Sequence, residues 1–192
     1  MTGFHNCMTE ISFTSKIVPI KTTDFLRYTA SFPRDNFVDC PWNISTSRVA
    51  RDVFTSNIAD CTSCLITTGK KALLMHLYPT NEANHDISKI EKYITNNLDM
   101  KDELQAVLVG SQPEKESLDI FNKFKKMLNN LGIPTSIFQT GKSRTHLAYK
   151  TSTDELVISS NYIDSGIIQG KNNKDILFDA FEKVEISACD EI

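Results

Sequence analysis

A cysteine and a histidine stand at the two ends of a segment that has the pattern of a β-hairpin. Residues 61–76 read CTSCLITTGKKALLMH, with apolar and β-branched residues on both sides of Gly69 and turn signals at Asp60 and Pro79. Folding this segment about Gly69 brings the Cys61 thiol towards the His76 imidazole. An imidazole that takes the thiol proton creates a reactive thiolate at neutral pH, so the pattern predicts a cysteine–histidine site for acyl transfer.

The register of the hairpin depends on its loop, and three loops are compatible with the sequence. A two-residue loop that ends at Gly69, which we prefer, places Cys61 opposite His76. A two-residue loop that begins at Gly69 places Cys64 opposite Met75, and a three-residue loop beginning there places Cys64 opposite His76. The preferred loop puts a threonine where a positive φ is needed, which counts against it. The spacing alone therefore does not decide between the two cysteines.

The same residues resemble the catalytic hairpin of the cytotoxic necrotizing factor deamidase toxins. Those toxins carry Cys-Thr-Thr, a similarly placed glycine and a histidine, which align without a gap with Cys61-Thr62-Ser63, Gly69 and His76. The resemblance implies that Cys61 is the nucleophile and His76 the base.

The chain also resembles, more distantly, the chemotaxis deamidase CheD. His76-Leu-Tyr-Pro79 is similar to its His-x-x-Leu-Pro, and the order of elements downstream is similar too, so that the likeness spans residues 50–162. Only the hairpin is specific. Thr55 stands six residues before Cys61, the spacing of a CheD threonine that orients the histidine. The resemblance implies that Thr55 orients His76.

One departure from these families lies directly before the nucleophile. They carry Ser-Gly or Gly-Ser there, whereas this chain has Ala59 and Asp60. Cys64, which follows Ser63, fits that local pattern better and is the alternative nucleophile.

Other interpretations of the cysteines and histidines are weaker. A cysteine in a strand is often a small buried hydrophobe. Cys61 and Cys64 could bind zinc together with His76 and His85, but no second closely spaced ligand pair exists. His146, on a predicted strand, is a rival general base. We predict no metal and no cofactor.

Composition indicates a single globular enzyme-sized unit. The chain has 192 residues, of which 40% are hydrophobic and 23% charged, enough to bury a core. A net charge of −3 gives no general attraction to nucleic acid or to an acidic membrane, and we expect a monomer. Five scattered cysteines favour a reducing compartment over a disulfide framework. Neither a transmembrane run nor a cleavable signal is present. If the chain is a bacterial effector, as the resemblance to the toxins implies, we expect it to be made in the bacterial cytoplasm and exported by a dedicated system to the host cytosol.

Periodicity predicts an α+β fold. We expect an N-terminal extension at 1–45 packed on a catalytic domain at 46–192. Strands outnumber helices and the hairpins are antiparallel, so we expect an α+β or α/β/α layered sandwich of two mixed sheets, with antiparallel pairs and with helices on the outside. Resemblance to CheD and the necrotizing factors implies that this sandwich has their deamidase fold. Within it the sequence predicts helices that begin at Asp86, at 113–117 and at an N-cap on Asn173, and strands at 48–55, 104–109, 135–138, 144–149 and 155–159.

The function that the resemblance implies is hydrolysis of a glutamine side-chain amide in another protein. We expect a bacterial effector or toxin whose partner is a protein with a reactive glutamine, such as a Rho-family GTPase. An amine in place of water would give transglutamination. The alternatives are a CheD-like chemoreceptor glutamine deamidase and an inactive interaction module on the same scaffold.

Overall fold

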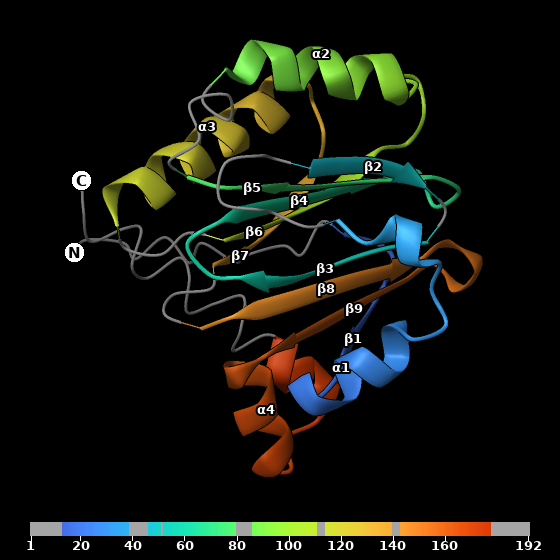
Figure 1. The fold of residues 1–192 in the computed structure, drawn as a ribbon, viewed down its shortest axis with the longest axis vertical. Helices are drawn as coiled ribbons and strands as arrows, with labels where there is room; N and C mark the ends of the chain where they lie inside the picture. The colour runs from blue at the N-terminus through green and yellow to red at the C-terminus, as the bar shows by residue number, and fades with distance from the viewer. Residues whose placement is uncertain are drawn as a thin grey trace, which may run out of the picture.

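The computed structural model describes residues 13–38, 46–50, 52–79, 86–110, 114–139 and 143–177. Two β-sheets are stacked face to face, and helices cover the outer face of each, so that the molecule has four layers (Figure 1). Both sheets contain parallel and antiparallel pairs. The predicted α+β sandwich of two mixed sheets flanked by helices is therefore confirmed, while the deamidase-like fold stays a prediction.

Sheet A has four strands in the order β1-β9-β8-β3. β1 runs parallel to β9, and the other neighbours are antiparallel. The predicted hairpin of residues 144–160 is formed by β8 and β9, which a short 3-10 turn, η3, joins. The bounds are β1 (Lys16–Pro19), β3 (Asp52–Ile58), β8 (Thr145–Lys150), η3 (Thr151–Thr153) and β9 (Glu155–Ser160).

Sheet B has five strands in the order β2-β5-β4-β6-β7. All neighbours are antiparallel except β6 and β7, which α3 connects as a parallel crossover. The bounds are β2 (Thr46–Ala50), β4 (Thr62–Thr67), β5 (Ala72–Leu77), β6 (Gln105–Gly110) and β7 (Thr135–Gln139).

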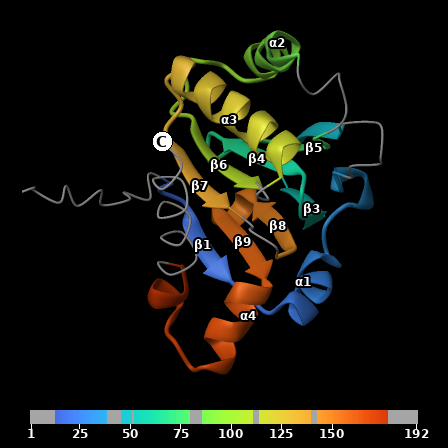
Figure 2. The same ribbon diagram turned by 90° about the vertical axis from the view of Figure 1, so that its left-hand side faces the viewer.

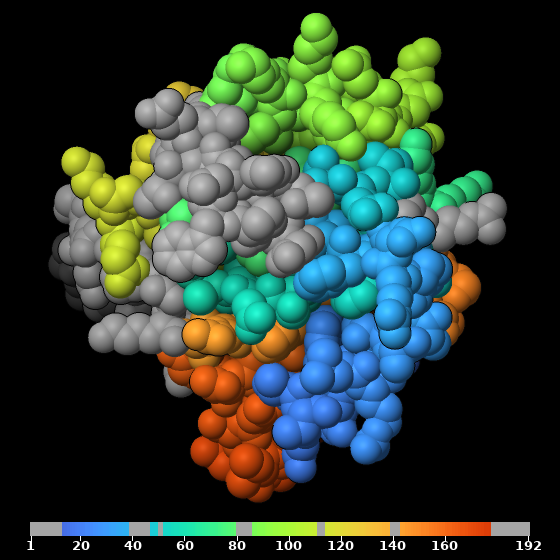
Figure 3. Space-filling model, viewed as in Figure 1, coloured from blue at the N-terminus to red at the C-terminus, as the bar shows by residue number. Residues whose placement is uncertain are grey.

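The helices divide between the two outer faces. α2 (Ile87–Asn97) and α3 (Lys115–Asn130) cover sheet B, and Figure 2 shows α3 running along β6 and β7. α1 (Thr22–Thr29) and α4 (Asn161–Ile168) lie on the side of sheet A, with the short η1 (Arg34–Asn36) after α1. In the space-filling view, α2 and the pair α1 and α4 lie at opposite ends of the molecule (Figure 3). Among the described residues, no helix has the length and apolarity needed to cross a bilayer.

The structure confirms two predicted helices and corrects the cap of a third. Asp86 caps α2 by accepting a hydrogen bond from the Lys89 amide, and α3 ends before Gly132, which has φ +69°. Residues 173–177 are helical, but the cap is Asn172, whose side chain accepts from the Asp175 amide at 3.0 Å. The rest of this predicted helix lies outside the described residues.

The predicted strand at 48–55 is wrong as a single strand. Its residues belong to two strands in different sheets, because β2 pairs with β5 and β3 pairs with β8. The sequence has no turn signal between them, so the local pattern alone gives no reason to divide it. Long-range pairing decides where each half goes.

Three apolar clusters of the described residues fill the layers, and two of them contain residues of the β4 and β5 hairpin. Alternate residues of β4 and β5, including Leu65 and Leu74, pack against sheet A residues such as Val53 and Leu147. The intervening residues, including Cys64 and Met75, pack against the helices α2 and α3. The direction of each side chain on the hairpin therefore decides which core it enters.

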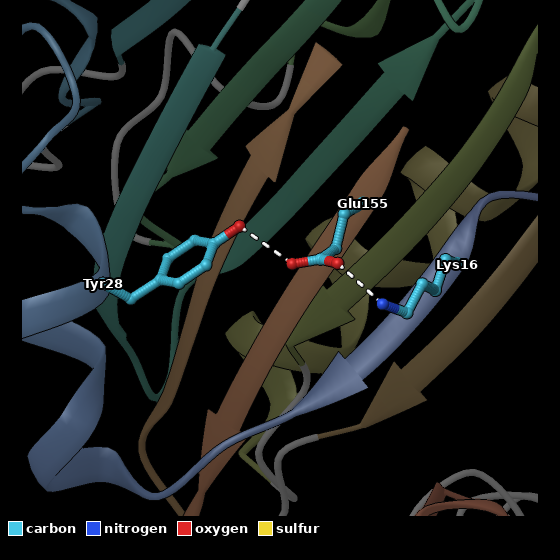
Figure 4. A network of polar contacts seen from close by, with 3 residues as sticks. All are labelled: Lys16, Tyr28 and Glu155. Carbon is cyan, nitrogen blue, oxygen red and sulfur yellow. Dashed lines mark hydrogen bonds and ion pairs between the residues drawn. The ribbon is translucent and has the colours of Figure 1, made fainter. Parts of the chain in front are cut away.

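Residues of the predicted extension are integrated into sheet A. β1 pairs with β9 along its length, and Phe25 of α1 is buried against the outer face of the sheet. Glu155 joins these elements: Tyr28 donates to one carboxylate oxygen at 3.1 Å and Lys16 Nζ lies 3.0 Å from the other (Figure 4). Burial and the Glu155 carboxylate raise the pKa of the Tyr28 phenol.

Candidate active site

The hairpin of β4 and β5 forms with a register different from the preferred one. Ser63, not Cys61, is opposite His76, and Cys64 is opposite Met75. Gly69 has φ +79° and takes the first position of a two-residue loop, which the Thr68 amide closes on the Lys71 carbonyl at 3.1 Å. A positive φ at the first loop position suits glycine and disfavours threonine, so the loop begins rather than ends at Gly69.

This register places the two cysteines differently relative to His76. Directly opposite residues share a face of the sheet, so Ser63 and His76 lie on the same face as Leu65 and Leu74, towards sheet A. Cys64 points to the other face, among apolar side chains under the helices. Cys64 cannot reach His76 without a change of register.

Cys64 has the environment of a structural cysteine. Its side chain has no exposed surface, and burial raises the pKa of the thiol far above its ordinary range. Because Cys64 and His76 lie on opposite faces of the hairpin, they cannot be ligands of one zinc ion. His85, the fourth residue of the zinc interpretation, lies outside the described residues.

Thr55 of sheet A contacts His76 of sheet B across the interior. Thr55 Oγ1 lies 2.8 Å from His76 Nδ1 and donates a hydrogen bond to the Val38 carbonyl. A hydroxyl has a single proton, so an oxygen that donates to Val38 must accept from the histidine. His76 therefore carries a proton on Nδ1, and its Nε2 is left with a lone pair when the ring is neutral.

The Nε2 atom of His76 is a buried polar atom without a hydrogen-bond partner in the described part of the chain. The side chain of His76 is only 2% exposed. An unsatisfied buried nitrogen costs free energy. The five other buried side-chain atoms without a partner in the described residues are serine or threonine hydroxyls, so His76 Nε2 is the one nitrogen among them. The hydrogen bond to Thr55 and the vacant Nε2 are what a general base requires.

Cys61 lies directly before β4, two residues from Ser63, and is 6% exposed. The backbone at residues 59–61 forms a bend, so Cys61 does not continue the strand. Because Ser63 is opposite His76, Cys61 lies at the same end of the hairpin as the histidine. Its Sγ donates to Asp60 Oδ1 at 3.7 Å. The Cys61 thiol is thus directed to Asp60, while His76 Nε2 at the same end of the hairpin has no hydrogen-bond partner among the described residues.

Two residues of the neighbouring elements fix the backbone at Cys61. Gly110, at the end of β6, has φ +147°, and a Cβ there would lie 2.5 Å from the Cys61 carbonyl oxygen. Ser117 of α3 is buried and donates to the Asp60 carbonyl at 2.7 Å. The residues before the hairpin are therefore held between the end of β6 and the first turn of α3.

The structure separates the rival base from this site. His146 lies on the opposite face of β8 from Leu147, against α1, where its ring centroid is 5.2 Å from that of Phe25. Burial lowers the pKa of His146. Thr55 and His76 are thus brought together, and Cys61 lies at the same end of the hairpin as His76, whereas Cys64 and His146 face elsewhere.

Sequence reasoning missed Val38, Gly110 and Ser117. A glycine directly after the apolar strand of residues 104–109 was a usable sign of close backbone approach. Val38 contributes only its carbonyl, so its side chain gives no such sign. It belongs to the predicted extension, which therefore reaches the site.

Comparison with protein-family models and with curated proteins found no match for this chain. The site therefore rests on its own geometry.

Replacing Thr55 by valine should reduce activity about 100-fold, because the buried Nδ1–H of His76 loses its acceptor and the ring its fixed tautomer. The dependence of the Cys61 alkylation rate on pH measures whether His76 still activates the thiol. We expect the rise in rate to move to higher pH in Thr55→Val and to return in Thr55→Ser, which keeps the hydroxyl. Equal profiles for all three proteins would show that Thr55 only packs.

Proposed function

We propose that the chain is a cysteine-dependent amidohydrolase that converts a glutamine of another protein to glutamate. Cys61 is the nucleophile, His76 the general base and Thr55 the residue that positions the histidine. The observation that carries the proposal is the hydrogen bond from His76 Nδ1 to Thr55, which leaves a buried Nε2 without a partner at the end of the hairpin that carries Cys61.

The reaction begins with proton transfer from the Cys61 thiol to His76 Nε2. For this the thiol turns from Asp60 to the histidine; catalytic hydrogen bonds that are long in the free enzyme commonly tighten when substrate binds. The thiolate attacks the carboxamide carbon of glutamine, and the Cys61 backbone amide helps to hold the oxyanion. The proton on Nε2 passes to the departing ammonia.

The second half of the reaction hydrolyses the thioester. His76 Nε2 takes a proton from water, the resulting hydroxide attacks the acyl carbon, and the C–S bond breaks to restore the thiol. The product is glutamate at the position of the glutamine. An amine in place of water would give a transglutaminated product by the same steps.

The substrate class rests on the sequence resemblance to the necrotizing factors and CheD. A switch glutamine of a Rho-family GTPase is the first candidate, and a bacterial effector that acts on a host protein the matching biological role. In GTPases this glutamine orients the water that attacks GTP, so its conversion to glutamate holds the GTPase in the GTP-bound state.

Intact-mass analysis tests the proposal. Incubation with a Rho-family GTPase should raise the GTPase mass by about one unit and slow its GTP turnover, because the altered residue no longer orients water. Cys61→Ser protein is the control and should do neither. A mass increase found only on a chemoreceptor fragment would favour the CheD-like alternative. If no protein in a broad panel gains mass, the inactive interaction module is favoured.

A further inference from the structure

A carboxylate stands beside the candidate nucleophile. Asp60 Oδ1 accepts from the Cys61 thiol at 3.7 Å, and the Asp60 side chain is half-buried. Among the described residues, no lysine or arginine forms an ion pair with Asp60. The Asp60 carbonyl is held by Ser117, so the residue cannot easily leave its place.

In the absence of substrate, the Asp60 carboxylate disfavours formation of the Cys61 thiolate. A carboxylate close to a sulfur disfavours the thiolate, because two negative charges then lie side by side in a partly desolvated space. The carboxylate also holds the thiol proton that His76 Nε2, buried and without a partner, is placed to receive. A positive charge next to Asp60 would remove both obstacles.

We propose that Asp60 selects substrates in which a lysine or arginine side chain lies next to the target glutamine. The proposal rests on the proposed function of Cys61 and His76. The substrate cation pairs with the Asp60 carboxylate, which releases the thiol to His76 Nε2. Asp60 is then a specificity-determining residue, and pairing with the substrate cation raises the fraction of thiolate above that of the free site.

Charged thiol reagents test the proposal at Cys61 without a known substrate. The trimethylammonioethyl and sulfonatoethyl methanethiosulfonates have similar sizes and opposite charges. Peptide mapping gives the rate at Cys61 for each. Each rate is divided by the rate of the same reagent with a free thiol, because an anionic thiolate by itself reacts faster with a cationic reagent. In the wild type the normalised rate should be roughly tenfold higher for the cationic reagent than for the anionic one, as expected for charges within several ångströms of a carboxylate. In Asp60→Asn the two normalised rates should become nearly equal.

Glu103→Gln is the matched control. It makes the same change in net charge at an exposed residue before β6, at the opposite end of that strand from Gly110, and should keep the tenfold ratio. Circular dichroism confirms that each variant is folded. A ratio near one in the wild type, or a ratio that Asp60→Asn leaves unchanged, would overturn the role of Asp60.

A second arm separates this inference from the proposed function. Peptides with glutamine flanked by lysine or by glutamate are compared for ammonia release, and the wild type should favour lysine by roughly tenfold, a preference that Asp60→Asn loses. Equal release from both peptides would overturn the selection by Asp60 and leave the deamidase intact. If folded protein reacts with neither reagent at Cys61 while denatured protein does, both proposals fall.

Discussion

Replacing Cys61 by serine should lower ammonia release from a protein that the wild type modifies by at least about 1,000-fold, while Cys64→Ser stays within about threefold. The serine hydroxyl is far less nucleophilic than a thiolate at neutral pH. Cys64 lies on the other face of β4, in the apolar layer under the helices, where it cannot contact the histidine. The two substitutions are chemically identical and three residues apart, so the comparison isolates the position of the thiol.

Iodoacetamide labelling of the native protein should follow the same order. Cys61 should be alkylated first, and Cys64, with no exposed surface and a raised pKa, only when the protein opens. In His76→Ala the labelling of Cys61 at pH 7 should slow about tenfold, because an ordinary thiol is only a few per cent ionised there. Activity lost with Cys64→Ser but kept with Cys61→Ser would reverse the assignment of the nucleophile.

Replacing Gly110 by alanine should lower the free energy of unfolding by about 3 kcal/mol, the sum of backbone strain and overpacking. The new Cβ would lie 2.5 Å from the Cys61 carbonyl oxygen and 2.9 Å from Thr62 Cα, with a φ of +147° that alanine rarely adopts. Both contacts are backbone atoms, which cannot turn aside as a flexible side chain does. Chemical denaturation measures the loss, and Cys61 labelling should slow because its backbone is displaced.

The Gly132→Ala variant separates the cost of backbone strain at a positive φ from the cost of the close Cβ contact at Gly110. Gly132 also has a positive φ, of +69°, but its Cβ would meet nothing within 4 Å. We expect a cost of about 1–2 kcal/mol from the left-handed conformation alone, with unchanged labelling of Cys61. Equal losses in the two variants would contradict a close contact between the end of β6 and the nucleophile.

Local patterns in the sequence were enough to predict most of the elements around the site. Apolar residues at helical spacing after Asp86 predict α2, and the run that ends at Gly132 predicts α3. The β8 and β9 hairpin follows in the same way from two alternating segments around a polar turn. These features depend on neighbours within a few residues, which the sequence shows directly.

The sequence by itself determined that residues 61–76 form a hairpin about Gly69 with Cys61 and His76 at its open end, since Gly69 is the only glycine between the two apolar segments. It did not determine the register, because that depends on a single φ angle in the loop, and a shift of one residue moves every side chain to the other face. The sequence resemblance already implied that Thr55 orients His76, but only the tertiary structure decided that Cys64 is buried under helices and that the Val38 carbonyl accepts a hydrogen bond from Thr55. Such contacts join residues far apart in the chain, so no local pattern encodes them.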